Sequence, residues 1–281
     1  MDSEATSRSR TINRYLLAWF DRLLEAETGG TPEPLPKAWC VVRTIAHRAS
    51  KRNWSAFLIG GAIRDLVLGG AAKTPRDFDI VLCNATQAEI AAEFSDLPLV
   101  RRTRLGGLRY DCGEVFVDIW PLEETFAVRN KKAVKIQDVT KHAFLDLEAV
   151  AVEISLGMGK PRQIIENGFT RAVLTRTLEV NYEQNPFPEV CVVKAIRTAT
   201  GLTLFMGDSL VEYIRSRDWD LNALVEAQKY HYGDIFLNEF QLRDVLEIVS
   251  GWNGKNGKLS LNSLISQRGP KEELSLRGIL S

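Results

Sequence analysis

The segment of residues 54–83 limits what this chain can fold into more strongly than any other stretch. Its first part, WSAFLIGG, is a compact apolar run ending in two glycines, which is typical of a buried strand. The run AIRDLVLG then predicts a short helix, and DFDIVLC predicts a second strand. The segment therefore indicates a strand, a helix and a strand, with Gly60-Gly61 where the first strand meets the helix.

The second strand of this segment carries two carboxylates, Asp77 and Asp79. Side chains two residues apart on a strand project from the same face, so both carboxylates point to one place. They repel each other unless a cation lies between them, and Mg²⁺ prefers hard oxygen ligands of this kind. A third acid, Asp118, interrupts the apolar run VFVDIW, so it either meets a cation or lies on an exposed strand face.

The glycine pair adds a second functional element. The first N–H groups of a helix have no intrahelical acceptor and bind phosphate oxygens, and a missing Cβ lets a phosphate approach closely. A phosphate-binding site next to carboxylates that hold two cations is the combination that nucleotidyl transfer requires. Each piece alone has a plainer explanation, as a tight turn, a capping residue or an edge residue. Their order and spacing together favour the functional interpretation.

The rest of the chain divides into a mixed front part and a helical back part. Helices are predicted over residues 12–24 and about 37–51, and another is opened by Thr86. Two strands follow around a Cys-Gly turn in LRYDCGEVFVDIWPL, then a mobile loop, EETFAVRNKKAVKIQD, and a strand in LEAVAVEISL. From about residue 169 the pattern is helical. We therefore expect a helical extension over 1–50, a mixed α/β domain over 51–168 and a helical domain over 169–281.

Composition excludes some classes of protein. Lys and Arg total 36, as do Asp and Glu, so bulk charge does not hold nucleic acid, although a local basic face is compatible with this balance. The four cysteines are widely spaced and indicate buried, reduced thiols. The N-terminal MDSEATSRSR has no apolar signal region, and no run approaches the length of a bilayer span. We expect a cytoplasmic protein with no membrane partner.

The segment from Gly60 to Gly69, followed by Arg76-Asp77-Phe78-Asp79-Ile80, resembles the signature of class II CCA-adding enzymes and bacterial poly(A) polymerases. These enzymes belong to the DNA polymerase β-like nucleotidyltransferase superfamily. Arg104-Leu105-Gly106-Gly107 is similar to a further family motif. The resemblance implies an α+β fold: a polymerase β-like nucleotidyltransferase head with a mixed β-sheet over 51–168, followed by an α-helical neck over 169–281.

The resemblance also implies roles for single residues. Asp77, Asp79 and Asp118 would be the catalytic carboxylates that hold a two-metal Mg²⁺ site, with Asp118 also assisting deprotonation of the acceptor hydroxyl. Gly60 and Gly61 would lie against the triphosphate. The remaining expected nucleotide contacts are Arg64, next to the glycines, and Lys194 and Arg197, in a helix similar to the family's neck helix.

The motifs that select the base in this family differ here. The segment from Lys141 to Leu147 keeps the family's phenylalanine as Phe144 but has lost its Asp and Asn, and leucine at 147 cannot hydrogen-bond a ribose. Pro188 and Cys191 stand where the family has the Asp and Arg that read ATP and CTP. A faithful CCA-adding enzyme is therefore not expected.

The leading hypothesis is Mg²⁺-dependent transfer of NMP from an NTP to an acceptor hydroxyl, with an RNA (tRNA) 3′ end as acceptor and no nucleic-acid template. NTP and RNA would be its partners. One alternative keeps this chemistry on another acceptor, as a toxin-type or defence-type modification of tRNA, protein or a small molecule. Another is a catalytically silent regulator that binds nucleotide or RNA.

Overall fold

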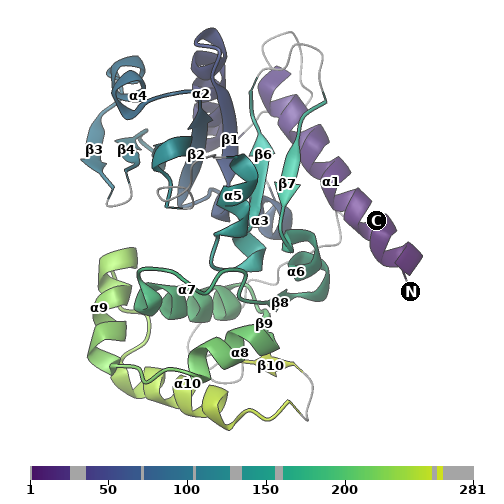
Figure 1. Ribbon diagram of the computed structural model, residues 1–281, viewed down its shortest axis with the longest axis vertical. Coiled ribbons are helices and arrows are strands. Elements are labelled where there is room, and N and C mark those ends of the chain that lie inside the picture. The colour runs from purple at the N-terminus through teal and green to yellow at the C-terminus, as the bar shows by residue number, and fades with distance from the viewer. Residues whose placement is uncertain are drawn as a thin grey trace. The chain divides into compact units, whose positions relative to one another are not determined.

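The computed structural model describes residues 2–25, 36–70, 73–103, 106–126, 135–155, 161–254 and 258–261. They form two compact units (Figure 1). The first unit holds the described residues up to 143 together with 148–170, and the second holds 144–147 together with those from 171 onward. The exact domain boundaries expected from the sequence stay a prediction.

The first unit is built on a seven-stranded sheet in the order β3-β4-β5-β2-β1-β6-β7. The strands are β1 (Ser55–Ile59), β2 (Asp77–Cys83), β3 (Leu99–Arg102), β4 (Leu108–Asp111), β5 (Phe116–Pro121), β6 (Val150–Glu153) and β7 (Ile164–Glu166). β2 and β5 run parallel, and every other neighbouring pair is antiparallel. The predicted mixed sheet is confirmed.

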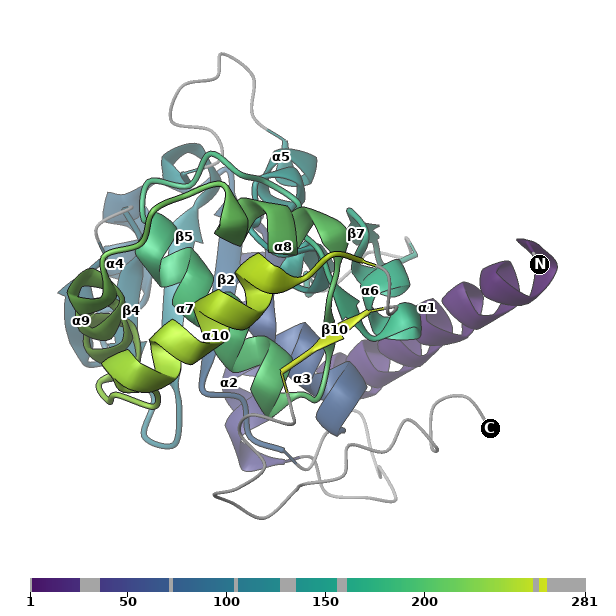
Figure 2. The same cartoon turned by 90° about the horizontal axis from the view of Figure 1, so that it is seen from below.

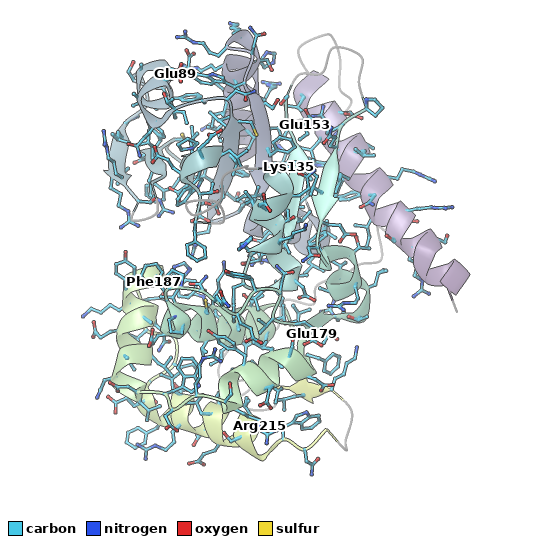
Figure 3. The ribbon with its side chains drawn as sticks, in the orientation of Figure 1. Glu89, Lys135, Glu153, Glu179, Phe187 and Arg215 are labelled. Atoms are coloured by element: carbon cyan, nitrogen blue, oxygen red, sulfur yellow. The ribbon has the colours of Figure 1, made fainter. Side chains whose placement is uncertain are left out.

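The helices of the first unit include those that the sequence predicts, but α1 begins ten residues before its predicted start and α5 was not predicted. They are α1 (Asp2–Glu25), η1 (Lys37–Trp39), α2 (Cys40–Lys51), α3 (Gly61–Gly69), α4 (Gln87–Glu93), η2 (Leu122–Glu124) and α5 (Ile136–Lys141). The predicted N-cap of α4 is confirmed, because Thr86 and Glu89 form a capping box there (Figure 3). Two elements cross the boundary between the units: η3 (Asp146–Glu148) and α6 (Phe169–Thr175).

The two faces of the sheet differ in character. Phe78 is fully buried and its ring lies 4.8 Å from that of Trp39, while the ring of Trp39 lies 4.4 Å from that of Trp19. These aromatic contacts place α1 and η1 against the Phe78 face. Asp77 and Asp79 alternate with Phe78, so they project from the opposite face. α5 packs on that opposite face farther along, where Ile136 joins a cluster with Val81.

The second unit is mainly helical, as expected. It contains α7 (Pro188–Gly201), α8 (Asp208–Arg215), α9 (Leu221–Tyr232) and α10 (Glu239–Gly251), with α10 packed on both α8 and α9 (Figure 2). A small sheet in the order β10-β9-β8 accompanies them: β8 (Thr177–Leu178), β9 (Phe205–Met206) and β10 (Leu259–Ser260). The half-buried carboxylate of Glu179, labelled in Figure 3, accepts from the backbone N–H of Ser209 and so connects the end of β8 to the start of α8.

Two parts of the sequence prediction need correction. The segment EETFAVRNKKAVKIQD was expected to be a mobile loop, but its first residues are in η2 and its last three begin α5, where Ile136 is buried. Residues 127–134 of that segment lie outside the described residues. The strands β3, β7, β8, β9 and β10 were not predicted, because runs of two to four residues are too short to show a period. No helix in the described part of the chain has the length and apolar character needed to cross a membrane.

Candidate functional site

The predicted carboxylates lie together on one face of the first unit's sheet. Asp79 on β2 is in register with Asp118 on the neighbouring parallel strand β5, so their side chains project from the same face. Asp77 lies two residues before Asp79 and shares that face. The side chain of Asp118 is only 7% exposed and that of Asp77 only 15%. The sheet therefore gathers three acids at a poorly solvated place.

A cation meets these acids, but it is a side chain that the sequence analysis did not single out. Arg109 on β4 donates from Nε to Oδ1 of Asp118 at 2.7 Å and from Nη2 to its Oδ2 at 2.6 Å. The same Nη2 lies 3.1 Å from Oδ2 of Asp77, reaching across β5 to β2. These bonds, and the nearby charge of Asp79, raise the pKa of Arg109 above its ordinary value, despite the opposing effect of burial.

The hairpin holds a signal that could have revealed Arg109. The loop between the two strands spans the four residues 112–115, and counting outward from it pairs Asp111 with Phe116 and Arg109 with Asp118. Counting from a two-residue Cys112-Gly113 turn would instead place Arg109 opposite Phe116. Residues directly opposite each other on antiparallel strands have neighbouring side chains. The pairing of an arginine with the buried aspartate therefore follows from the sequence only if the loop is given four residues rather than the predicted two. The two alternatives left open for Asp118 are resolved by this contact, because it is buried and meets the cationic guanidinium.

The predicted glycines occupy the junction between β1 and α3. Gly60 has φ +70° and ψ −129°, a backbone conformation that side chains with a Cβ rarely adopt. Its N–H donates to the carbonyl of Val150, and its carbonyl accepts from the N–H of Ile63 at 3.1 Å. Gly61 is the first residue of α3, so its N–H points out of the helix N-terminus. The phosphate-binding role expected for the pair stays a prediction.

Arg64, expected to position the nucleotide, is held by two acids of the first unit. Its Nε donates to Oδ1 of Asp65 at 2.8 Å, and its Nη1 donates to Oε1 of the buried Glu148 at 2.6 Å. Its side chain is 16% exposed, and a Cβ built on Gly61 would lie 3.4 Å from its Nη2. The guanidinium therefore lies directly beside the start of α3.

The other two expected nucleotide contacts belong to the second unit. Lys194 and Arg197 both lie on α7. The Arg197 guanidinium lies 4.0 Å from the centre of the Tyr232 ring, and its Nη1 lies 3.1 Å from Oδ1 of Asp234. Arg197 thus stacks on an aromatic ring of α9, and the nucleotide-binding role of both residues stays a prediction.

The positions that match the family's ribose-binding residue (Leu147) and base-reading residues (Pro188 and Cys191) carry side chains that are unsuited to those roles. Leu147 is fully buried, Cys191 is buried, and Pro188 is the first residue of α7. None of the three presents a group that could pair with the edge of a base.

The donor set fits a divalent cation in chemistry but not in its present arrangement. Carboxylate oxygens suit Mg²⁺, and three acids on adjacent strands supply enough of them. Among the residues that the structure describes, however, no three Asp, Glu, His or Cys side chains are arranged closely enough to hold a metal ion. The guanidinium of Arg109 is bonded to two of the three acids instead.

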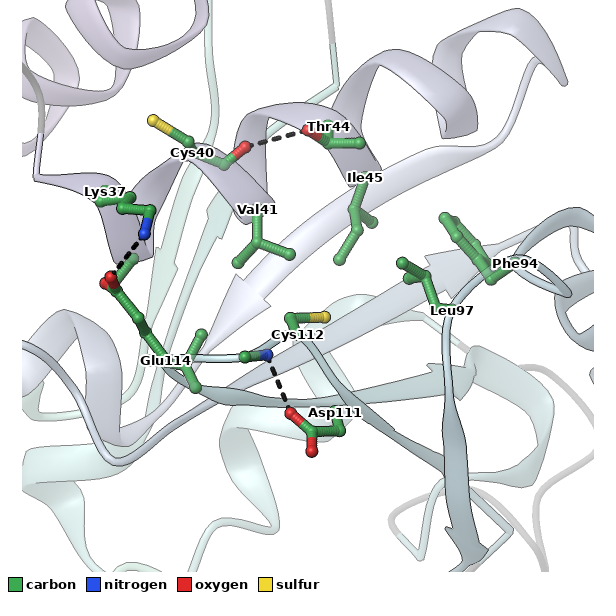
Figure 4. A pocket seen from close by; sticks show the side chains of 13 residues that line it. Lys37, Cys40, Val41, Thr44, Ile45, Phe94, Leu97, Asp111, Cys112 and Glu114 are labelled. Carbon is green, nitrogen blue, oxygen red and sulfur yellow. Dashed lines mark hydrogen bonds and ion pairs between the residues drawn. The ribbon is translucent and has the colours of Figure 1, made fainter.

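A separate cavity of about 500 Å³ lies on the other side of the sheet (Figure 4). It is lined by residues of α2, such as Cys40 and Val41, and by the turn between β4 and β5. An ion pair of 3.0 Å between Lys37 and Glu114 lies at its edge. None of the three acids lines it, so it is not part of the carboxylate site.

Comparisons with known proteins place this geometry in context. No family model matches the chain. Poly(A) polymerase I of Salmonella typhi and poly(A) polymerase I of Escherichia coli O157:H7 are each 39% identical to it over 67 residues, which cover 24% of this chain and 14% of the relative. The chain therefore spans only a small part of the curated relatives that it matches.

Solved structures match over a longer span. A CCA-adding enzyme in complex with CTP aligns with a TM-score of 0.58 and 15% identity, covering 81% of this chain and 54% of the other. A tRNA nucleotidyltransferase in complex with a primer tRNA and an incoming ATP analogue aligns with a TM-score of 0.54 and 17% identity, covering 75% and 64%. A tRNA-processing enzyme in an apo form aligns at 0.57 and 18%, covering 79% and 62%.

These likenesses show that the chain has the nucleotidyltransferase head fold of the CCA-adding enzymes. The predicted fold class is confirmed, and so is the resemblance to CCA-adding enzymes and poly(A) polymerases. The chain covers less than two thirds of each of these structures.

Proposed function

We propose that this chain is a nucleotidyltransferase that transfers NMP from an NTP to an RNA 3′ end, with tRNA as the first-choice acceptor and no template. The observation that carries the proposal is the gathering of Asp77, Asp79 and Asp118 on one face of two parallel strands. The names of the structural neighbours support it, since they include a tRNA nucleotidyltransferase with primer tRNA and an enzyme with CTP. The proposal assigns this chemistry to the cytoplasm.

The reaction makes one bond and breaks one. The oxygen of the acceptor hydroxyl bonds to the α-phosphorus of the NTP, the bond from that phosphorus to the pyrophosphate oxygen breaks, and the hydroxyl proton leaves. Negative charge increases on the phosphoryl oxygens and on the leaving pyrophosphate. A site for this reaction must hold the hydroxyl in line with the phosphorus and must stabilise that charge.

The three acids have distinct parts in the proposal. Asp77 and Asp79 would hold Mg²⁺, and Asp118 would accept from the acceptor hydroxyl and complete the metal-binding set. Mg²⁺, when bound, would supply the positive charge that neutralises the phosphates and lowers the pKa of the hydroxyl. Both oxygens of Asp118 are bonded to Arg109, so the acceptor hydroxyl would compete with that guanidinium for the carboxylate.

The triphosphate would lie at the start of α3. Gly60 and Gly61 leave room for its oxygens, and the N-terminus of α3 offers N–H donors and a partial positive charge. Arg64 lies beside this place and adds a full positive charge. Lys194 and Arg197 of the second unit stay proposed contacts of the nucleotide.

The test is a transfer assay with each of the four α-labelled NTPs, Mg²⁺ and total cellular RNA. Wild-type protein is compared with the double variant Asp77→Asn/Asp79→Asn. A matched control is Glu123→Gln, an exposed carboxylate on η2 of the same unit. We expect label in RNA with wild type and with Glu123→Gln, and none with the double variant.

Two results would contradict the proposal. Label entering RNA equally with the double variant would mean that the acids are not catalytic. Label entering protein or a small molecule in the same reaction, but not RNA, would keep the chemistry and replace the acceptor.

A regulator that binds nucleotide without turnover is the second candidate. The observation that favours it is the guanidinium of Arg109 at the centre of the acids, where a catalytic cation would bind. It predicts NTP binding, measured by equilibrium dialysis, without label in any acceptor.

A further inference from the structure

Arg109 contacts two strands of the carboxylate site at once. A cross-strand pair with Asp118 alone would be an ordinary feature of an antiparallel ladder. Arg109 makes an additional contact, because its Nη2 also lies 3.1 Å from Oδ2 of Asp77. Asp77 belongs to β2, which is not a neighbour of β4 in the sheet. The guanidinium therefore bridges acids of β2 and β5 at their common face.

The site has a surplus of negative charge that this guanidinium partly balances. Three acids meet there, and Arg109 carries one positive charge, with Arg76 adding another at 3.1 Å from Oδ2 of Asp77. The Arg76 side chain is 54% exposed, whereas that of Arg109 is 21% exposed. Arg109 is therefore the less screened of the two, and it bonds to both oxygens of the most buried acid.

We propose that Arg109 is a gate on the metal site: its guanidinium and a divalent cation exclude each other between Asp77 and Asp118. The inference rests on the proposed function for the identity of the cation. Without nucleotide, Arg109 holds the acids in a metal-poor state. The negatively charged triphosphate of the incoming NTP binds the guanidinium in place of the carboxylates. Asp77 and Asp118 are then available to bind the metal.

Geometry and charge both make the two cations exclusive. Mg²⁺ binds its oxygens at about 2.0–2.1 Å and demands near-octahedral order, which oxygens already aimed at a guanidinium fork do not offer. A second positive charge a few ångströms from the guanidinium, at a site mostly out of water, would also be strongly repelled. The acids can therefore serve one of the two cations at a time.

The guanidinium has a second position available, beside an aromatic ring near solvent. Its carbon lies 5.5 Å from the centre of the Phe116 ring, and Phe116 is 40% exposed at the start of β5. A swing along that ring carries Arg109 toward solvent while its stem stays packed. The planar fork matches the oxygens of a phosphate as well as those of a carboxylate, so the triphosphate is a suitable second partner.

The experiment is a Mn²⁺ titration of the nucleotide-free full chain, with free Mn²⁺ read from its electron paramagnetic resonance signal. Wild type is compared with Arg109→Met, which keeps an unbranched stem and removes the charge. We expect Arg109→Met to bind Mn²⁺ on the order of tenfold more tightly or better, because a competing charge has gone. Adding Asp118→Asn to this variant should abolish the gain.

Arg171→Met is the matched control, because Arg171 also pairs with a buried acid, Asp146, but in the second unit. It should bind Mn²⁺ as wild type does. Equal or weaker Mn²⁺ binding by Arg109→Met, or an equal gain in Arg171→Met, would overturn the proposal.

A second variant covers the case in which Arg109→Met does not fold. Arg109→Lys keeps the charge that the acids need, but one ammonium cannot reproduce the fork on both oxygens of Asp118. It should bind Mn²⁺ more tightly than wild type, by a smaller factor than Arg109→Met. Unchanged Mn²⁺ affinity in Arg109→Lys would count against the gate.

The two proposals fail in different ways. Tighter Mn²⁺ binding by the Arg109 variants, with no label transferred by wild type, would support the gate and reject the enzyme. Labelled RNA from wild type, with Mn²⁺ affinity unaffected at position 109, would support the enzyme and reject the gate.

Discussion

Two buried aspartates, one in each unit, have arginine partners and yet differ in their surroundings. Asp118 in the first unit is held by both oxygens to Arg109, and Asp77 and Asp79 lie beside it. Asp146 in the second unit accepts from the backbone N–H of Glu179 at 3.0 Å and lies 3.3 Å from Arg171. Its arginine is 65% exposed, whereas Arg109 is 21% exposed.

We infer from this difference that Asp146 has a structural role, whereas Asp118 belongs to the proposed catalytic site. Backbone N–H groups and one exposed arginine satisfy Asp146, and burial raises its pKa to about 6. The acids around Asp118 exceed their nearest buried cation in number, so the site keeps negative charge that a fold has no need of. A surplus of like charge at a poorly solvated place indicates ligand binding, whereas a single buried acid with local donors indicates packing.

The largest expected difference between the two regions is in activity. Asp77→Asn should lower NMP transfer by on the order of a hundredfold or more, because it removes an oxygen that stabilises the transferring phosphate. Asp146→Asn should leave transfer within a few-fold of wild type, because the amide oxygen still accepts from Glu179. Initial rates with labelled NTP measure both, and equal losses would erase the distinction between the two acids.

Removing the two arginines should separate the regions in stability. Arg109→Met leaves partly buried acids without their cation and should lower the free energy of unfolding by about 2–4 kcal/mol. Arg171→Met should cost about 0–1 kcal/mol, because an exposed partner is largely screened. Urea unfolding in EDTA measures both. A loss for Arg109→Met no larger than that for Arg171→Met would contradict the charge surplus.

Two glycines with positive φ give a comparison of the backbone. Gly60 has ψ −129°, far from the left-handed helical region, whereas Gly233 ends α9 with ψ −3° in that region. Gly60→Ala should cost about 2–3 kcal/mol and Gly233→Ala about 1 kcal/mol, because a Cβ is tolerated better in the second conformation. Thermal unfolding of both variants checks the order, and a larger cost at Gly233 would show that strain at Gly60 is absent.

The smallest expected effect is the pH dependence that Asp146 confers. Its pKa of about 6 lies above the ordinary value of 3.8, so the folded state binds the proton more tightly than the unfolded state does. The contribution of Asp146 to the free energy of unfolding is therefore fully present below pH 4, and it is lost as the pH rises from about 4 to about 6. The free energy of unfolding of wild type relative to Asp146→Asn should fall by about 1–2 kcal/mol over this window. A constant difference between the two proteins would contradict the raised pKa.

Local signals in the sequence were sufficient for most of the fold. The strand, helix and strand around Gly60 and Asp77 form within one or two residues of their predicted bounds, because period and breakers act over short distances. Thr86 was identifiable as a cap from its own neighbours. The α5 helix was missed because its six residues carry too few turns to show an apolar stripe, and tertiary packing of Ile136 stabilises it.

The candidate site was only half predictable. Asp77 and Asp79 share a strand, so their common direction follows from period alone. Arg109 reaches Asp77 only because β5 lies between β4 and β2, and that strand order is a long-range property of the sheet. The charges carried by Lys194 and Arg197 were visible, but the stacking of Arg197 on Tyr232 depends on how α9 packs on α7.

The most direct test of the account is a crystal structure of the wild-type chain with Mn²⁺ and a non-hydrolysable NTP analogue. We predict an anomalous Mn²⁺ peak bonded to Asp77 and Asp79, the triphosphate at the N-terminus of α3, and Arg109 moved off Asp118 onto a phosphate. Nucleotide bound with no metal at these acids, and Arg109 still bridging Asp118 and Asp77, would contradict it.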